Sequence, residues 1–149
     1  MAAIRTATAS WQGDLMSGTG TTSAGTSDTF RDLPISWGSR TEAPEGRTSP
    51  EELLAAAHAS CFAMAFSADL DRAGTPPEHL HVEAEVTFDK VEAGWSVVSS
   101  HLRVIGRAPG ATSESFDKVA EGTRDGCPIS RALAGNVALS VDATLETDG

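Results

Sequence analysis

Apolar and small residues fill every helical face of the chain between residues 53 and 68. Leaving aside the thiol of Cys61, His58 is the only side chain in this run that can carry charge near neutral pH. A helix that is apolar on all sides is normally buried all round. The run is shorter than the roughly 18 apolar residues that a membrane span needs. We therefore expect a helix that is buried in protein rather than in lipid.

Signals at both ends set the limits of this helix. Ser49 can serve as the N-cap, Pro50 fits the first helical position, and Glu52 completes a capping box. The segment 74–77, Gly-Thr-Pro-Pro, ends the helix, because glycine caps it and proline cannot continue it. The sequence thus predicts one long helix over residues 49–72.

Six other segments have the Thr/Ser-rich composition or the alternation of apolar and polar residues that predicts strands. They are residues 4–11, 18–25, 33–38, 81–91, 95–107 and 136–146. Val97 and Val98 are adjacent apolar residues, which indicates a bulge or a change of face. Residues 113–124 predict a shorter amphipathic helix, and Pro128 can begin another. The polar segment 39–48 is expected to be a surface loop.

The order of these elements predicts an α+β fold with antiparallel sheets rather than βαβ units. A chain of 149 residues suits a single domain over residues 1–149. Six short strands hardly cover a helix that is apolar on all sides, but a second copy of the chain could.

Charge and cysteine content narrow the function. The net charge of −10 argues against nucleic acid and anionic membrane as partners, because both are polyanions. The first residues lack a basic segment followed by an apolar run, so a cytoplasmic protein is expected. Two cysteines in a reducing compartment are inert core residues, metal ligands or redox groups.

The two thiols differ in their local surroundings. Cys127 lies at the start of a predicted helix, where unpaired amides favour a thiolate. Cys61 lies in the middle of an apolar helix, which should raise its pKa unless a cation reaches it. The candidate cations are Arg40, Arg47 and His58. Local chemistry alone would therefore select Cys127 as the nucleophile.

The candidate site residues also have interpretations that do not involve a reactive site. Cys61 taken alone would be an ordinary buried thiol. His58, Cys61 and Cys127 could form a zinc set, but no fourth ligand has suitable spacing, so neither a metal nor another cofactor is expected. His58 fits better as a hydrogen-bonded core residue. If Glu52 only completes the capping box, Glu51 is free for another role.

Two cysteine motifs and the segment between them form a specific pattern. The first motif is Pro50–Leu53 followed by Ala56–Phe62, and the second is Gly126–Ser130. The segment between them is Leu80–Gly94, which ends in Asp-Lys-Val-Glu-Ala-Gly. Together they resemble the OsmC/Ohr peroxidases over most of the chain. The osmotically inducible (OsmC) branch is more similar, because Arg40 precedes the helix. The first hairpin, at Trp11–Asp14, has no arginine of the kind that the Ohr branch carries there.

This resemblance implies a fold in which antiparallel sheets wrap around long buried central helices in an intertwined homodimer. It implies a thiol peroxidase that reduces organic hydroperoxides to alcohols and protects against oxidative or osmotic stress. Cys61 would attack the peroxide and become a sulfenic acid, and Cys127 would condense with it to a disulfide. A dithiol, such as a lipoyl group carried on a protein, would restore both thiols. Arg40 would hold Cys61 as a thiolate, with Glu51 fixing the guanidinium.

Two alternatives from other classes remain open at this stage. One is a non-enzymatic thiol redox sensor, and the other is a small-ligand-binding protein. Helix geometry adds one expectation about the site. Glu51 and Cys61 are ten residues apart, which is about 15 Å along a straight helix, so both cannot contact one guanidinium unless the helix is broken or the Glu51 end lies elsewhere. If two copies of the helix pack antiparallel, the two chains would share each site.

Overall fold

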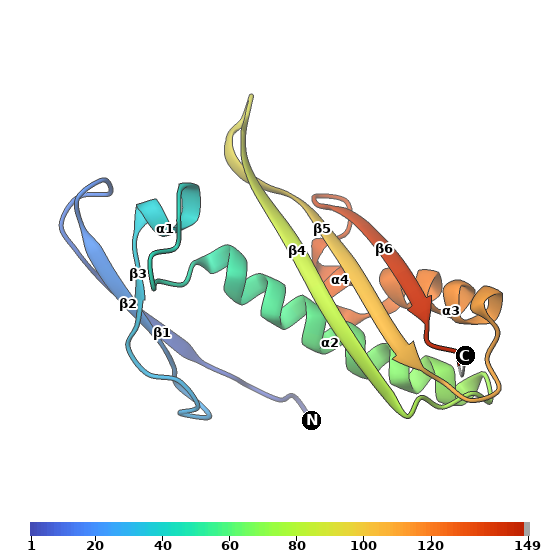
Figure 1. The fold of residues 1–149 in the computed structure, drawn as a ribbon. Coiled ribbons are helices and arrows are strands. Elements are labelled where there is room, and N and C mark those ends of the chain that lie inside the picture. The colour runs from blue at the N-terminus through green and yellow to red at the C-terminus, as the bar shows by residue number, and fades with distance from the viewer. Residues whose placement is uncertain (148–149) are drawn as a thin grey trace. The chain divides into compact units, whose positions relative to one another are not determined.

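The computed structural model describes residues 1–147. The chain divides into two compact units, Met1–Leu53 and Leu54–Gly149 (Figure 1). The boundary falls inside α2 (Pro50–Arg72), the long central helix that the sequence predicts at 49–72. That the two units act as one domain stays a prediction.

The first unit contains a meander of three short strands. They are β1 (Ala7–Gln12), β2 (Thr19–Ala24) and β3 (Leu33–Ile35), which pair in chain order. Both pairings are antiparallel, with Thr8 opposite Ser23 and Thr21 opposite Pro34. The predicted meander is confirmed.

A short helix, α1 (Trp37–Thr41), follows β3 where the sequence predicted a strand end and a loop. Its N-cap is Ser36, whose Oγ accepts from the backbone N of Ser39 at 3.1 Å, while the Ser39 hydroxyl accepts from the Ser36 backbone N at 3.2 Å. This is a capping box in which serine replaces the usual Glu or Gln, and for that reason the sequence did not reveal it. The Ser39 hydroxyl also donates to the Thr48 carbonyl oxygen, which ties α1 to the start of α2.

The second unit contains a sheet in the order β4 (His79–Val91), β5 (Gly94–Arg107) and β6 (Ala138–Leu145). β4 and β5 are antiparallel, and their register passes over Val98, which confirms the predicted bulge. The α+β class is confirmed. β5 and β6 are parallel, however, so the expectation of antiparallel pairing is wrong for this pair. The reason is the crossover through α3 (Ser113–Gly126) and α4 (Pro128–Leu133), which returns the chain to the end of the sheet at which β5 begins.

The core of this unit lies between one face of the sheet and the helices (Figure 1). Its buried residues come mainly from α2, β5 and α3, and they are Phe62, Phe66, Leu70, Leu102, Val104, Ala108, Phe116, Ala120 and Cys127. The ring of Phe66 lies 5.3 Å from that of Phe62 and 4.9 Å from that of Phe116, centroid to centroid. The contact between Phe66 and Phe116 packs α2 against α3.

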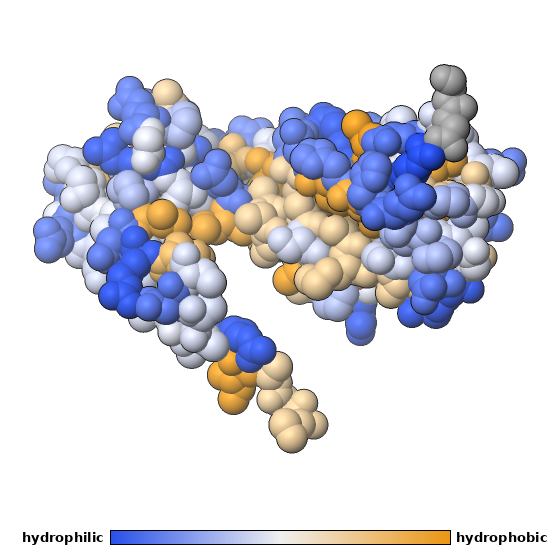
Figure 2. Space-filling view, turned by 60° about the horizontal axis from the view of Figure 1, so that its bottom comes forward, coloured by the Kyte–Doolittle hydropathy of each residue, from blue (hydrophilic) through white to orange (hydrophobic). Residues whose placement is uncertain are grey.

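The burial of α2 in the second unit follows one stripe rather than the whole circumference. His58, Phe62, Phe66 and Leu70 are buried at intervals of four residues, whereas the Met64 side chain is 70% exposed. Figure 2 shows apolar surface along this part of the molecule. The expectation of burial all round is therefore wrong for one chain, because its own sheet covers only one side. The helix also has the length and hydropathy of a membrane span, which core helices of soluble proteins share.

Candidate functional site

Cys61 and Cys127 are brought together by the fold of the second unit. Cys61 lies in the middle of α2, and Cys127 is both the C-cap of α3 and the N-cap of α4. Their sulfur atoms are 3.4 Å apart although 66 residues separate them in the sequence. Both are free thiols, with Cys127 buried and Cys61 half-buried. A pair at this distance can exchange a proton or, after oxidation, form a disulfide with a small movement.

The surroundings of Cys61 raise the pKa of its thiol. Burial is the main cause, because it disfavours the thiolate. A hydrogen bond from the backbone N–H of Ile129, in the first turn of α4, opposes this shift, while the neighbouring Cys127 adds to it. The start of α4 therefore acts on Cys61, a contact that sequence reasoning missed.

His58 is fully buried one helical turn before Cys61. Its Nδ1 lies 2.6 Å from the Ser100 Oγ on β5, and its Nε2 lies 2.8 Å from the Ser130 Oγ on α4. Burial lowers the pKa of this histidine, so the ring is neutral near pH 7. The interpretation as a hydrogen-bonded core residue is confirmed. Both ring nitrogens are engaged by hydroxyls, which gives the alternative of a zinc site no support.

Arg40 and Glu51 form an ion pair inside the first unit. The Nε of Arg40, on α1, donates to the two carboxylate oxygens of Glu51, on the first turn of α2, at 2.7 and 3.3 Å. The Glu51 side chain is only 9% exposed, so solvent screens this pair less than a surface pair. Glu52 does not compete for the arginine, because its carboxylate accepts from the Thr48 hydroxyl at 2.7 Å.

An apolar cavity of about 260 Å³ lies beside Arg40 in the first unit. It is lined mainly by Trp11, Leu15, Ile35 and Trp37. The Trp37 ring also lies against the guanidinium, with its centroid 5.6 Å from the Arg40 Cζ. Sequence reasoning placed neither tryptophan near the site. The signal that could have found Trp37 is its spacing of three residues from Arg40, but only once α1 is known to be helical.

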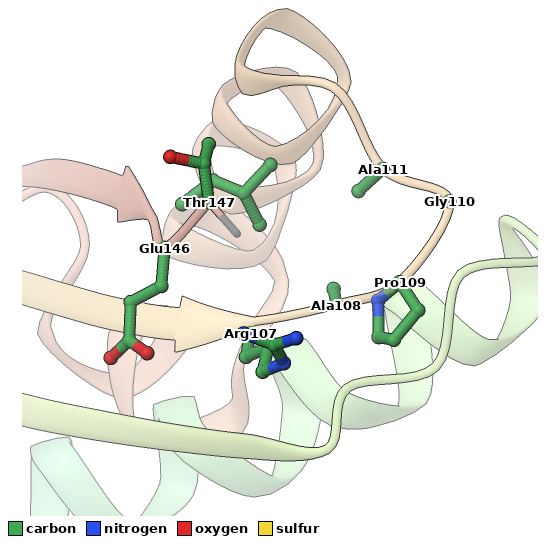
Figure 3. A pocket seen from close by; sticks show the side chains of 8 residues that line it. Arg107, Ala108, Pro109, Gly110, Ala111, Glu146 and Thr147 are labelled. Atoms are coloured by element: carbon green, nitrogen blue, oxygen red, sulfur yellow. The ribbon is translucent and has the colours of Figure 1, made fainter. Parts of the chain in front are cut away.

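A second cavity, of about 220 Å³, lies where β5 and β6 end (Figure 3). Figure 3 shows Glu146 on one side of Arg107 and, on the other side, Ala108 and Pro109, where the chain leaves β5. Arg107 pairs with Glu78 at 2.9 Å. Neither thiol lines this cavity, so we do not assign it to the site.

Comparison with known proteins adds the family. Residues 43–142 match the family described as OsmC-like protein. The chain belongs to the OsmC-like family. Three of the predicted site residues, Glu51, Cys61 and Cys127, fall within the matched region, and Arg40 lies just before it.

Relatives of this OsmC-like chain carry informative names. The chain is 37% identical over 131 residues to peroxiredoxin OsmC of Escherichia coli (strain K12), covering 88% of this chain and 90% of that protein. The crystal structure of an organic hydroperoxide resistance protein from Elizabethkingia anophelis aligns with a TM-score of 0.72 at 21% identity, over 98% of this chain and 100% of that one. An OsmC-like protein from Mycoplasma pneumoniae aligns with a TM-score of 0.73 at 14% identity, over 99% and 100%. These structures show the shared fold.

Proposed function

We propose that this OsmC-like protein is a cysteine-based peroxidase that reduces organic hydroperoxides to alcohols. The observation that carries the proposal is the 3.4 Å separation of the Cys61 and Cys127 sulfur atoms. A free thiol pair of this kind suits a two-cysteine redox cycle. The Escherichia coli relative is named a peroxiredoxin, and the Elizabethkingia anophelis structure is that of an organic hydroperoxide resistance protein, which supports the same reaction class.

The cycle has two steps on the protein. The Cys61 thiolate attacks the terminal oxygen of the hydroperoxide, the O–O bond breaks, and the leaving alkoxide takes up a proton to become the alcohol. Sulfur loses two electrons and becomes a sulfenic acid. The Cys127 thiol then attacks this sulfur, so that an S–S bond forms and the hydroxyl group leaves with the thiol proton as water.

An external dithiol closes the cycle by giving two electrons and two protons to the disulfide. Cys127 is the proposed leaving group in this exchange. A lipoyl group carried on a protein is the reductant that the family resemblance implies. We place the protein in the cytoplasm, where both cysteines stay reduced between turnovers.

Arg40 is the proposed activating cation. Inside the second unit, burial and the Cys127 neighbour raise the Cys61 pKa, so a thiolate at neutral pH needs a positive charge from elsewhere. The Arg40–Glu51 pair offers one that is fixed in direction. The apolar cavity beside Arg40 could receive the organic group of the peroxide.

The proposed site is shared between two copies in a homodimer. On one straight helix, Glu51 and Cys61 lie about 15 Å apart along the axis, so an arginine held by that Glu51 does not reach Cys61 of the same helix. Antiparallel pairing of two α2 helices would bring the Arg40–Glu51 pair of one copy to the thiols of the other. It would also cover the apolar side of α2 that one chain leaves exposed, Met64 included.

The test is multiple turnover of cumene hydroperoxide with a dithiol supply. We expect activity in the wild type and none in Cys61→Ser. The matched variant Cys127→Ser should consume one equivalent of peroxide and stop as a sulfenic acid that a dimedone-type probe traps. A sensor would react once without turnover, and a ligand-binding protein would not react. Organic peroxide should react faster than hydrogen peroxide, and equal second-order rates would contradict the apolar substrate site.

A further inference from the structure

The buried His58 joins three elements of the second unit. Its ring belongs to α2, its Nδ1 contacts the Ser100 hydroxyl on β5, and its Nε2 contacts the Ser130 hydroxyl on α4. All three side chains are completely buried. A hydrogen bond between buried groups is costly to lose, because the partner left behind has no water to replace it. The ring therefore ties the sheet to α4 through the central helix.

α4 depends on such contacts for its position. It has only six residues, too few for a helix that is stable alone, and its N-cap Cys127 makes no side-chain capping bond. Its first turn meets α2 at three points. The Cys127 sulfur lies 3.4 Å from that of Cys61, the Ile129 N–H bonds the Cys61 sulfur, and the Ser130 hydroxyl bonds His58.

These contacts repeat with the same spacing on both helices. His58 and Cys61 are three residues apart on α2, which places them on one helical face, and Cys127, the N-cap of α4, likewise precedes Ser130 by three residues. The contact between His58 and Ser130 therefore lies beside the contact between Cys61 and Cys127. A shift of α4 that breaks the first contact also disturbs the second.

We infer that His58 is a positioning residue of the proposed peroxidase. Through Ser130 it holds the first turn of α4 on Cys61, with the other side of its ring anchored to Ser100 on the sheet. In this position the Ile129 N–H stabilises the Cys61 thiolate, and Cys127 stays within reach of the sulfenic acid. The inference rests on the proposed function for its catalytic meaning, but not for its geometry.

The two serines offer a matched pair of variants. Ser100→Ala and Ser130→Ala each remove one hydroxyl from the same buried ring, and only Ser130 lies on α4. We expect similar losses in the free energy of unfolding. Ser130→Ala should also slow disulfide formation after oxidation by about three- to tenfold, the factor that the net strength of one hydrogen bond allows. It should raise the Cys61 pKa, measured by the pH dependence of thiol alkylation, whereas Ser100→Ala leaves both readouts near wild type.

Substitution of the histidine gives a second matched pair. The amide of glutamine can occupy the place of the histidine Nε2, and that of asparagine the place of the Nδ1. His58→Gln should keep the Ser130 contact and the rate of disulfide formation, whereas His58→Asn should lose both. Equal rates in Ser100→Ala and Ser130→Ala, with stability alone reduced, would show that His58 is only structural and would overturn the inference.

The rate of disulfide formation is measured with diamide as well as with peroxide. Diamide oxidises neighbouring thiols without peroxidase chemistry, so this comparison reports the position of Cys127 directly. If the wild type consumes no peroxide, the proposed function fails, and the diamide rates still decide the inference. If the wild type turns over peroxide but the two serine variants behave alike with both oxidants, the inference fails and the proposed function stands.

Discussion

At the scale of single residues, the protonation state of the Cys61 thiol depends on surroundings that act on its pKa in opposite directions. Burial and the Cys127 neighbour raise its pKa, and one backbone N–H from Ile129 lowers it. The balance within the second unit is upward, so the thiol of that unit alone is a poor nucleophile at neutral pH. The guanidinium of Arg40 is the group that we propose reverses the balance.

Arg40→Ala should therefore raise the Cys61 pKa and slow the reaction with cumene hydroperoxide at pH 7 by at least about tenfold. Arg40→Lys keeps the charge but loses the planar contact with Glu51. Its reaction rate and Cys61 pKa should therefore lie between those of the wild type and those of Arg40→Ala. Stopped-flow rates and the pH dependence of alkylation measure both effects. An unchanged alkylation profile in Arg40→Ala would contradict this role.

His58 links stability to pH. Its pKa in the folded state is lowered by burial, so the unfolded chain binds the proton more readily. Its contribution to stability is complete above about pH 6.5, the ordinary value for histidine, and is lost as the pH falls from there through the folded pKa. We expect the free energy of unfolding of the wild type to fall more steeply between pH 7 and 5 than that of His58→Gln. Parallel curves from denaturant titrations would contradict this assignment.

At the scale of elements, α1 and α4 are short helices that carry groups of the proposed site. Neither is long enough to be stable alone. α1 depends on the Ser36–Ser39 capping box and on the bond from Ser39 to Thr48. α4 depends on its contacts with α2. Small helices of this kind place a functional group well only when neighbouring contacts hold them.

Ser36→Ala should loosen α1 and misplace Arg40, at a cost of about 1 kcal/mol in the free energy of unfolding. We expect weaker activation of Cys61 and a higher KM for the organic peroxide. Thr112→Ala is the matched control, because Thr112 caps α3 with the same serine-based box in the other unit. It should cost similar stability and leave the kinetics unchanged. Equal kinetic losses in both variants would indicate general destabilisation instead.

At the scale of the whole molecule, packing and the proposed chemistry both favour a second copy. One chain leaves an apolar side of α2 exposed, and it carries the Arg40–Glu51 pair and the thiol pair in different units. A homodimer with antiparallel central helices would answer both needs. Interfaces built on such helices are large and apolar, so a stable monomer is not expected.

Sedimentation at low concentration should show a dimer. Inactive Glu51→Ala and inactive Cys61→Ser chains, unfolded together and refolded, should regain about a quarter of the wild-type activity, because half of the random dimers carry one intact site of two. Each variant refolded alone is the control. No recovery would place the site within one chain, and an active monomer would refute the shared site.

The sequence by itself determined the local elements and the family. The long helix, the strands and the bulge at Val98 follow from periodicity and end signals, which depend on neighbours in the chain. The cysteine motifs indicated the OsmC-like family through residue identity and spacing alone. The sequence did not predict α1, because its capping box uses serine where Glu or Gln is usual.

Only the tertiary structure decided which groups meet. It paired β5 with β6 in parallel and selected the buried side of α2. It placed Cys127 on Cys61 across 66 residues of sequence, and Ser100 and Ser130 on His58 across 42 and 72. Periodicity indicates on which face of its own helix or strand a residue lies, but not which residue of another element it contacts. The partner is chosen when the core closes, because burial then makes every unpaired polar group costly.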